Sequence, residues 1–141
     1  MNLDDAPPAV SQRAILDTSV FIAAESGRPL RYQLLPEEGV STVITLAELN
    51  AGVLAATESS TRSLRLRTLT RLAAMELLGV DLRAAEMWAQ MRVFLAERHR
   101  RINVNDLWIA SIALAHGLPI ATQGNDFTSL EDFPGVSIIK V

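Results

Sequence analysis

Residues 13–26, RAILDTSVFIAAES, place an aspartate between two apolar segments. Residues 13–16 have the short apolar character of a buried strand, and residues 18–25 are expected to form a short helix. Asp17 stands where the strand ends and the helix begins, although an aspartate is rarely buried without a partner. We therefore interpret Asp17 in one of two ways: its side chain caps the helix, or it faces a positively charged group.

The rest of the chain repeats this alternation of short apolar runs and longer helical patterns. Strands are expected at residues 40–43, 80–82, 118–122 and 136–141, a helical turn at 32–35, and helices at 45–57, 61–78, 83–99 and 104–116. Alternating strands and helices are typical of an α/β domain with a largely parallel sheet covered by helices on both faces. Ligands of such sheets bind beyond the carboxyl ends of the strands, which is where Asp17 is expected.

The length of 141 residues fits a single domain, which we expect over residues 13–141 after a flexible arm at residues 1–12. The arm, MNLDDAPPAVSQ, lacks the basic start and the long apolar core of a signal peptide. No apolar run approaches the roughly 20 residues that span a membrane. The chain has no cysteine, which excludes disulfides and cysteine zinc sites. A reducing, cytoplasmic compartment is therefore expected.

The charge of the chain is uneven. The net charge is −3, so no overall positive field attracts nucleic acid, yet twelve of the thirteen basic residues are arginines. A guanidinium binds phosphate through a planar pair of donors that lysine lacks. The candidate phosphate-binding residues are Arg62, Arg65, Arg71, Arg98, Arg100 and Arg101. The alternative is that these side chains only solvate helix surfaces.

Three further acids are expected at the same edge of the sheet as Asp17. Glu48 lies in the first turns of the helix after the second strand, Asp106 lies in the first turn of a later helix, and Asp126 follows a strand. Strand carboxyl ends and the helix starts that follow them meet at one edge of a parallel sheet. The sequence therefore predicts that the four carboxylates converge.

Each of these acids also has a structural explanation. Thr45 and Glu48 match a capping box, Asp106 would favour the positive end of its helix, and Asp126 suits a turn. These explanations weaken when the acids are considered together, because two carboxylates about 4 Å apart repel by about 4 kcal/mol at an effective dielectric near 20. Capping does not require four acids at one edge, whereas a bound divalent cation would relieve the repulsion.

The available donors favour a hard metal ion at this edge. Oxygen ligands suit Mg²⁺ or Mn²⁺, and Mg²⁺ usually keeps several waters that a substrate can replace. The chain has only two histidines, His99 and His116, so a zinc site is disfavoured. Such an ion supports phosphate chemistry, because it activates a bound water and neutralises charge on the phosphate.

The acids and their surroundings resemble PIN-domain ribonucleases, and most closely the VapC toxins of bacterial VapBC toxin–antitoxin modules. The resemblance runs from about residue 13 to the C-terminus. Its matching segments are ILDTSVFIAA with Asp17, VSTVITLAEL with Glu48, NDLWIASIALAHGLPIAT with Asp106, and NDF with Asp126. The chain departs from many relatives at Gly124, where they carry an acid or an asparagine.

The resemblance implies a fold, an activity and partners. The fold would be a five-stranded parallel sheet of order 3-2-1-4-5 between helices. The four acids would hold one or two Mg²⁺ or Mn²⁺ ions and activate water to cleave RNA, leaving a 5′-phosphate and a 3′-hydroxyl. Thr18 and Thr122 would support these ligands or contact the substrate. The protein would form a homodimer, and a VapB-like antitoxin would block the acidic pocket.

Two other interpretations fit parts of the sequence. An aspartyl phosphatase or a phosphate-accepting receiver domain is disfavoured because Ser19 stands where the phosphatase needs a second aspartate, and because the only lysine is Lys140. No nucleotide-binding glycine motif is present. The second alternative is a non-catalytic PIN-like module that binds RNA or protein. The presence of all four acids favours an enzyme.

Overall fold

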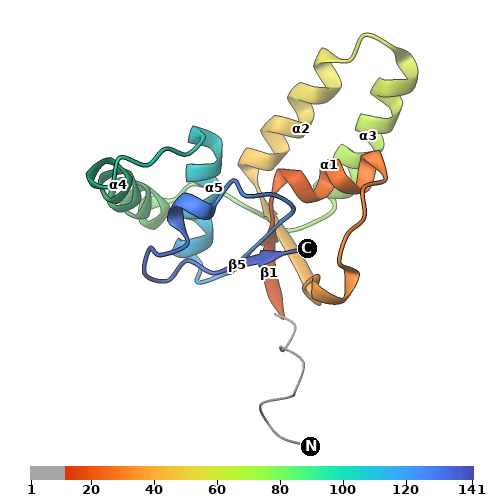
Figure 1. Ribbon diagram of the computed structural model, residues 1–141. Coiled ribbons are helices and arrows are strands. Elements are labelled where there is room, and N and C mark those ends of the chain that lie inside the picture. Colours follow the sequence, from red (N-terminus) through yellow and green to blue (C-terminus); the bar gives the residue numbers. More distant parts are fainter. Residues whose placement is uncertain (1–11) are drawn as a thin grey trace, which may run out of the picture.

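The computed structural model describes residues 12–141, which form a parallel sheet with helices on both sides (Figure 1). The strands are β1 (Arg13–Leu16), β2 (Glu38–Thr42), β3 (Leu77–Leu78), β4 (Ile120–Thr122) and β5 (Ile138–Lys140). Every strand pair is parallel, and the order β3-β2-β1-β4-β5 confirms the predicted topology. Of the predicted arm at residues 1–12, residues 1–11 lie outside the described residues.

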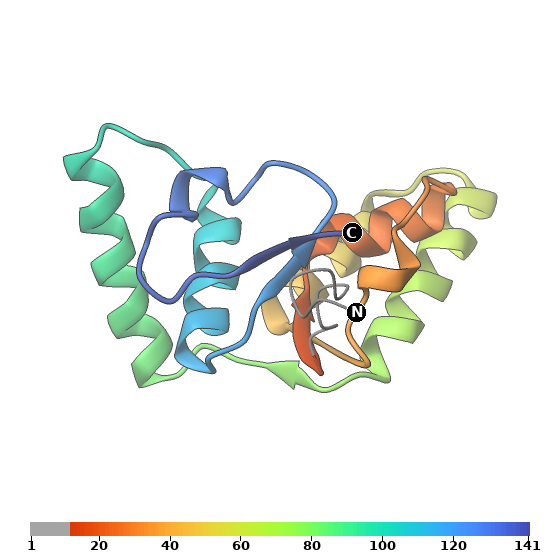
Figure 2. The same ribbon diagram turned by 60° about the horizontal axis from the view of Figure 1, so that its bottom comes forward.

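Five α-helices and two short 3₁₀ turns connect the strands. The helices are α1 (Thr18–Ser26), α2 (Val43–Ala55), α3 (Ser59–Ala73), α4 (Leu82–Glu97) and α5 (Val104–Ala115), and the turns are η2 (Tyr32–Leu34) and η3 (Thr128–Leu130). Figure 2 shows α4 and α5 on one side of the sheet and α1 and α3 on the other. None of the helices within residues 12–141 is long and apolar enough to cross a membrane.

The central strand β1 is fixed by burial on both faces. Ala14 and Ile15 are fully buried, and Ile15 belongs to the core that the sheet forms with α4 and α5. On the other side, Phe21 of α1 packs with Leu49 of α2 and Leu72 of α3. Because β1 is held between two cores, the residue that follows it has a defined position at the sheet edge.

The third strand lies elsewhere than the sequence predicted. The strand expected at residues 80–82 is wrong: α3 ends at Ala73, and residues 77 and 78 pair with Ser41 and Thr42 of β2. Asp81 caps α4 by accepting a hydrogen bond from the backbone of Ala84 at 2.8 Å. Val80 and Leu82, the apolar residues on either side of Asp81, are exposed, and the chain continues into α4 instead of forming a strand there.

Candidate active site

The Asp17 side chain is held by two hydroxyl groups. Asp17 occupies the cap position before α1 in an extended conformation, but its side chain makes no capping hydrogen bond to the described helix. Instead, Ser19 Oγ donates to Oδ1 at 2.6 Å and Thr122 Oγ1 donates to Oδ2 at 2.7 Å. Asp17 as a whole is only 2% exposed. The Asp17 side chain is therefore held mainly by these two hydroxyl groups, and we call Ser19 and Thr122 the hydroxyl clamp.

The clamp joins two elements that are distant in the sequence. Thr122 ends β4, and the resemblance had singled it out as a supporting residue. Ser19 was missed, although a hydroxyl residue two positions after an aspartate is a common local hydrogen-bond pattern. Its Oγ also accepts from the backbone N–H of Gln123 at 3.0 Å, which ties the start of α1 to the loop after β4.

Glu48 lies in the second turn of α2 and does not cap it. The helix begins at Val43, two residues earlier than predicted, because the side chain of Thr42 accepts from the backbone N–H of Thr45 at 3.2 Å. The predicted capping box of Thr45 and Glu48 is therefore wrong. Glu48 Oε1 instead accepts from Thr18 Oγ1 at 2.9 Å. Thr18, which directly follows Asp17, thus links the Glu48 carboxylate to the start of α1.

Asp106 is the most strongly perturbed acid of the site. It lies in the first turn of α5, where Asn103 already caps the helix by accepting from the backbone of Asn105 at 2.8 Å. Burial is the largest cause, and the nearby negative charges of Asp126, Asp17 and Glu48 add to it; together they raise the pKa of Asp106 to about 7. Asp126, Asp17 and Glu48 therefore lie close enough to Asp106 for their charges to act on its carboxyl.

Burial also raises the pKa of Asp17, although the hydrogen bonds from Ser19 and Thr122 oppose that shift. The negative charge of Asp126 adds to the rise. Both aspartates consequently have a higher affinity for protons, or for another cation, than an exposed aspartate has.

The donor set fits a hydrated Mg²⁺ or Mn²⁺ ion. Within residues 12–141 no three His, Cys, Asp or Glu side chains are arranged as a complete metal-binding group. A hydrated Mg²⁺ ion does not need such a group, because it typically binds one or two carboxylates and keeps several waters. The clamp hydroxyls leave lone pairs free on both oxygens of Asp17, so this carboxylate can still bind a cation.

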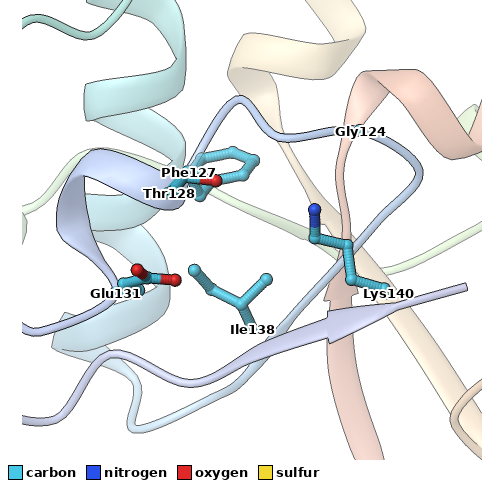
Figure 3. A pocket seen from close by; sticks show the side chains of 6 residues that line it. All are labelled: Gly124, Phe127, Thr128, Glu131, Ile138 and Lys140. Atoms are coloured by element: carbon cyan, nitrogen blue, oxygen red, sulfur yellow. The ribbon is translucent and has the colours of Figure 1, made fainter.

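Asp126 lies on an exposed loop that is anchored on both sides. The Gln123 side-chain amide donates to the carbonyl of Val141 at 2.5 Å, and Lys140 donates to the side chain of Asn125. Beside this loop lies a cavity of about 320 Å³, with the Glu131 and Lys140 side chains on opposite sides (Figure 3). These anchors hold the loop of Asp126 against β5.

The candidate phosphate-binding arginines differ in their contacts. Arg62 donates to the carbonyl of Ala56 at 2.6 Å and Arg65 to that of Gly52 at 2.7 Å, so both fasten α3 to the end of α2. The guanidinium of Arg98 lies 3.6 Å from the centre of the Phe94 ring. Arg100 donates to Asp132 Oδ1 at 2.6 Å. Across residues 12–141, the two remaining candidates, Arg71 and Arg101, have no side-chain hydrogen bond or ion pair.

The family assignment follows from a comparison with known proteins. The family model described as PIN domain matches residues 14–132. The chain belongs to the PIN-domain family. Within that family it is 53% identical over 127 residues to Ribonuclease VapC5 of Mycobacterium tuberculosis, covering 90% of this chain and 94% of that protein. Ribonuclease VapC4 of the same organism is 41% identical over 129 residues, covering 90% and 98%.

Solved structures of PIN-domain relatives agree with this assignment. The crystal structure of VapBC-5 from Mycobacterium tuberculosis superposes with a TM-score of 0.87 at 48% identity, covering 92% of this chain and 99% of that one. DNA-bound VapBC from Salmonella typhimurium gives a TM-score of 0.74 at 26% identity, covering 93% and 98%. The chain is thus a VapC-type ribonuclease of the PIN-domain family, which favours the enzyme over the non-catalytic alternative.

The raised pKa of Asp106 leads to a prediction about stability. Because its pKa is raised from 3.8 to about 7, the Asp106 carboxyl binds a proton more readily in the folded protein than in the unfolded chain. Its contribution to the free energy of unfolding is therefore complete below about pH 4 and is lost as the pH rises through about 7. In EDTA, Asp106→Asn should therefore raise the melting temperature more at pH 8 than at pH 5. Thermal melts at the two pH values measure this difference. Glu86→Gln, an exposed change on α4, is the control, and an equal effect of Asp106→Asn at both pH values would contradict the prediction.

Proposed function

We propose that this ribonuclease is the toxin of a VapBC-type module and cleaves RNA with one or two Mg²⁺ or Mn²⁺ ions held by Asp17, Glu48, Asp106 and Asp126. The observation that carries this proposal is the buried, clamped carboxylate of Asp17 together with the raised pKa of Asp106. Acids that repel one another at one edge of the sheet destabilise the fold, so packing alone does not explain their presence. A cation bound between them turns that repulsion into affinity.

Each part of the site has a distinct task in this proposal. When bound, the ion lowers the pKa of a coordinated water and neutralises charge on the phosphate. Ser19 and Thr122 fix the orientation of the Asp17 carboxylate, and Thr18 fixes that of Glu48. Without a bound ion, Asp106 can hold or release a proton near neutral pH because its pKa is about 7, and a bound cation would favour its charged form. The reaction would leave a 5′-phosphate and a 3′-hydroxyl.

We further propose that arginines carry the RNA contacts, because the net charge of −3 provides no general attraction. Arg71 and Arg101 are the best placed of the six candidates, since the other four have partners within the chain. The protein would act in the cytoplasm, where cellular RNA is available, and as a homodimer.

A VapB-like antitoxin is the proposed protein partner, in keeping with the VapBC complexes among the solved relatives. The acids form a negatively charged site whenever no metal is bound, and a partner's arginine could pair with them through two parallel hydrogen bonds. A cavity of about 270 Å³ between α1, α2 and α3 extends from Glu48 and Thr18 to Ile22 and Leu49. An amphipathic helix of the antitoxin fits such a groove, with its basic residue at the acidic end.

Expression in bacteria tests the toxin function. Production of the wild-type chain alone should arrest growth and create discrete new 5′ ends in cellular RNA. Co-expression with the reading frame adjacent to its gene should relieve the arrest, and the two products should copurify. Asp17→Ala is the control, and its expression should neither arrest growth nor create new 5′ ends in cellular RNA. Harmless accumulation of folded wild-type protein, with unchanged RNA ends, would contradict the proposal.

A further inference from the structure

A second cavity, outside the acid cluster, is lined by arginines. It has a volume of about 440 Å³ and lies between α4 and the segment that leads into α5. Arg92, Arg100 and Arg101 line it together with Trp88, and none of its lining residues is acidic. Such a concentration of guanidinium groups stands out in a chain with a net charge of −3. We call this cavity, with these four residues, the arginine cavity.

Two of the three guanidinium groups are free to bind a ligand. Arg100 is held by Asp132 Oδ1 at 2.6 Å and by the carbonyl of Ser129 at 3.2 Å, so it fastens the η3 region to the cavity wall. Arg92 and Arg101 are exposed and have no hydrogen bond or ion pair with any part of the chain from residue 12 onward. A guanidinium without a carboxylate partner favours an anion with several acceptor oxygens.

Trp88 forms a rigid part of the cavity wall. The indole ring stacks on Trp108 with ring centres 5.1 Å apart and planes 20° apart, which fixes its orientation. Its Nε1 atom is buried and has no acceptor among the described residues. Because this N–H is not accessible from the cavity, the ring gives the cavity its shape and donates no hydrogen bond to a ligand there.

The position of the arginine cavity connects it to the acid cluster. Val104 and Leu107 line the cavity, and Asp106 lies between them in the first turn of α5. An α-helix with its side chains is about 10 Å wide, so the cavity and the Asp106 carboxylate are separated by about one helix width. A single RNA strand whose backbone passes the acids can reach the cavity within a few nucleotides.

We propose that the arginine cavity is a subsite for the RNA substrate that binds a backbone phosphate a few nucleotides from the scissile bond. Arg92 and Arg101 contact the phosphate oxygens, and the Trp88 ring forms part of the wall beside them. Arg100 shapes the wall through Asp132. This inference rests on the proposed function, because it extends the path of the RNA beyond the acid cluster.

RNA binding can be measured without cleavage in the Asp17→Asn background. The probe is a fluorescein-labelled 12-nucleotide single-stranded RNA, followed by fluorescence anisotropy between 50 and 200 mM KCl. Arg92→Gln with Arg101→Gln should weaken binding about tenfold or more and lower the salt slope by about 1.4, since each phosphate contact on a single strand contributes about 0.7. The matched control is Arg67→Gln with Arg83→Gln, which removes the same charge from exposed positions outside the cavity. Its effect on both quantities should be much smaller.

Trp88→Phe is a second control. The phenyl ring can still stack on Trp108, but the unpaired buried N–H is gone. RNA affinity should stay within about twofold of the wild type while the melting temperature stays equal or rises. The proposal is overturned if the Arg92 and Arg101 pair behaves like its control. It is also overturned if a polyglutamate peptide displaces the RNA and binds this cavity more tightly, which would indicate a protein ligand.

The failure of the subsite is distinguishable from failure of the proposed function. Wild-type protein is assayed in parallel for cleavage of the same RNA in Mg²⁺. Cleavage by the wild type together with normal RNA binding by the double variant would remove the subsite and leave the proposed function intact. An absence of wild-type cleavage would remove the proposed function itself.

Discussion

Replacing Asp17 by alanine should lower the rate of RNA cleavage about a thousandfold or more. A catalytic metal ion contributes several kcal/mol to transition-state stabilisation, and each 1.4 kcal/mol corresponds to a factor of ten. Asp17 is the carboxylate whose two oxygens are both fixed by neighbouring hydroxyls, so no other acid can take over its position. Initial rates with a 5′-labelled RNA at saturating Mg²⁺ measure the effect. Asp106→Asn should cause a loss of similar size.

Folding controls make this result interpretable. Both variants remove mutual repulsion among the acids, so in EDTA they should unfold at the same temperature as the wild type or higher. Glu86→Gln, an exposed acid outside the cluster, should retain full activity. The wild type itself should lose activity in EDTA and regain it with Mg²⁺ or Mn²⁺. Full cleavage in EDTA, or by either folded variant, is incompatible with a metal site built on these acids.

The combined change Ser19→Ala and Thr122→Val should lower activity about 10–100-fold and raise the Mg²⁺ concentration required. That range is typical for the loss of groups that orient metal-binding side chains. Both hydrogen bonds to Asp17 disappear, whereas the carboxylate itself remains. These bonds oppose the upward shift of the Asp17 pKa, so activity in the variant should also fall off at a higher pH on the acid side.

A matched substitution separates orientation from packing. Thr122→Ser keeps the hydroxyl at a fully buried position and should remain close to wild type in activity and Mg²⁺ requirement. Thr122→Val keeps the shape and loses the donor. If both single variants show the same Mg²⁺ titration as the wild type, the hydroxyl clamp has no part in metal binding.

Much of the fold could be predicted from the sequence. The apolar run before Asp17 identified the central strand, and the strand order followed from the family resemblance. The third strand was misplaced because residues 77 and 78 continue the apolar pattern of α3. Only their pairing with β2 distinguishes them from a helix, and that pairing depends on residues more than 30 positions earlier.

The site was predicted better in its acids than in their support. The position of each acid after a strand or at a helix start was enough to predict convergence. The capping box at Glu48 failed because Thr42 and Thr45 are both threonines that can cap, and the true start of α2 decides between them. Likewise, the sequence could not show that Arg62 and Arg65 would reach backbone carbonyls at the end of α2. Such contacts depend on how the two helices pack.

The distance along the chain between the partners of the hydroxyl clamp has a consequence during protein synthesis. Thr122 lies 105 residues after Asp17, so a nascent chain on the ribosome cannot orient that aspartate until β4 has been made and has emerged. At about 5–20 residues per second, this interval lasts about 5–20 s. A chain released early by a stalled or truncated message would carry Asp17 and Glu48 but no assembled site. Translation of this ribonuclease therefore yields an assembled Asp17 site only after β4 has been synthesised.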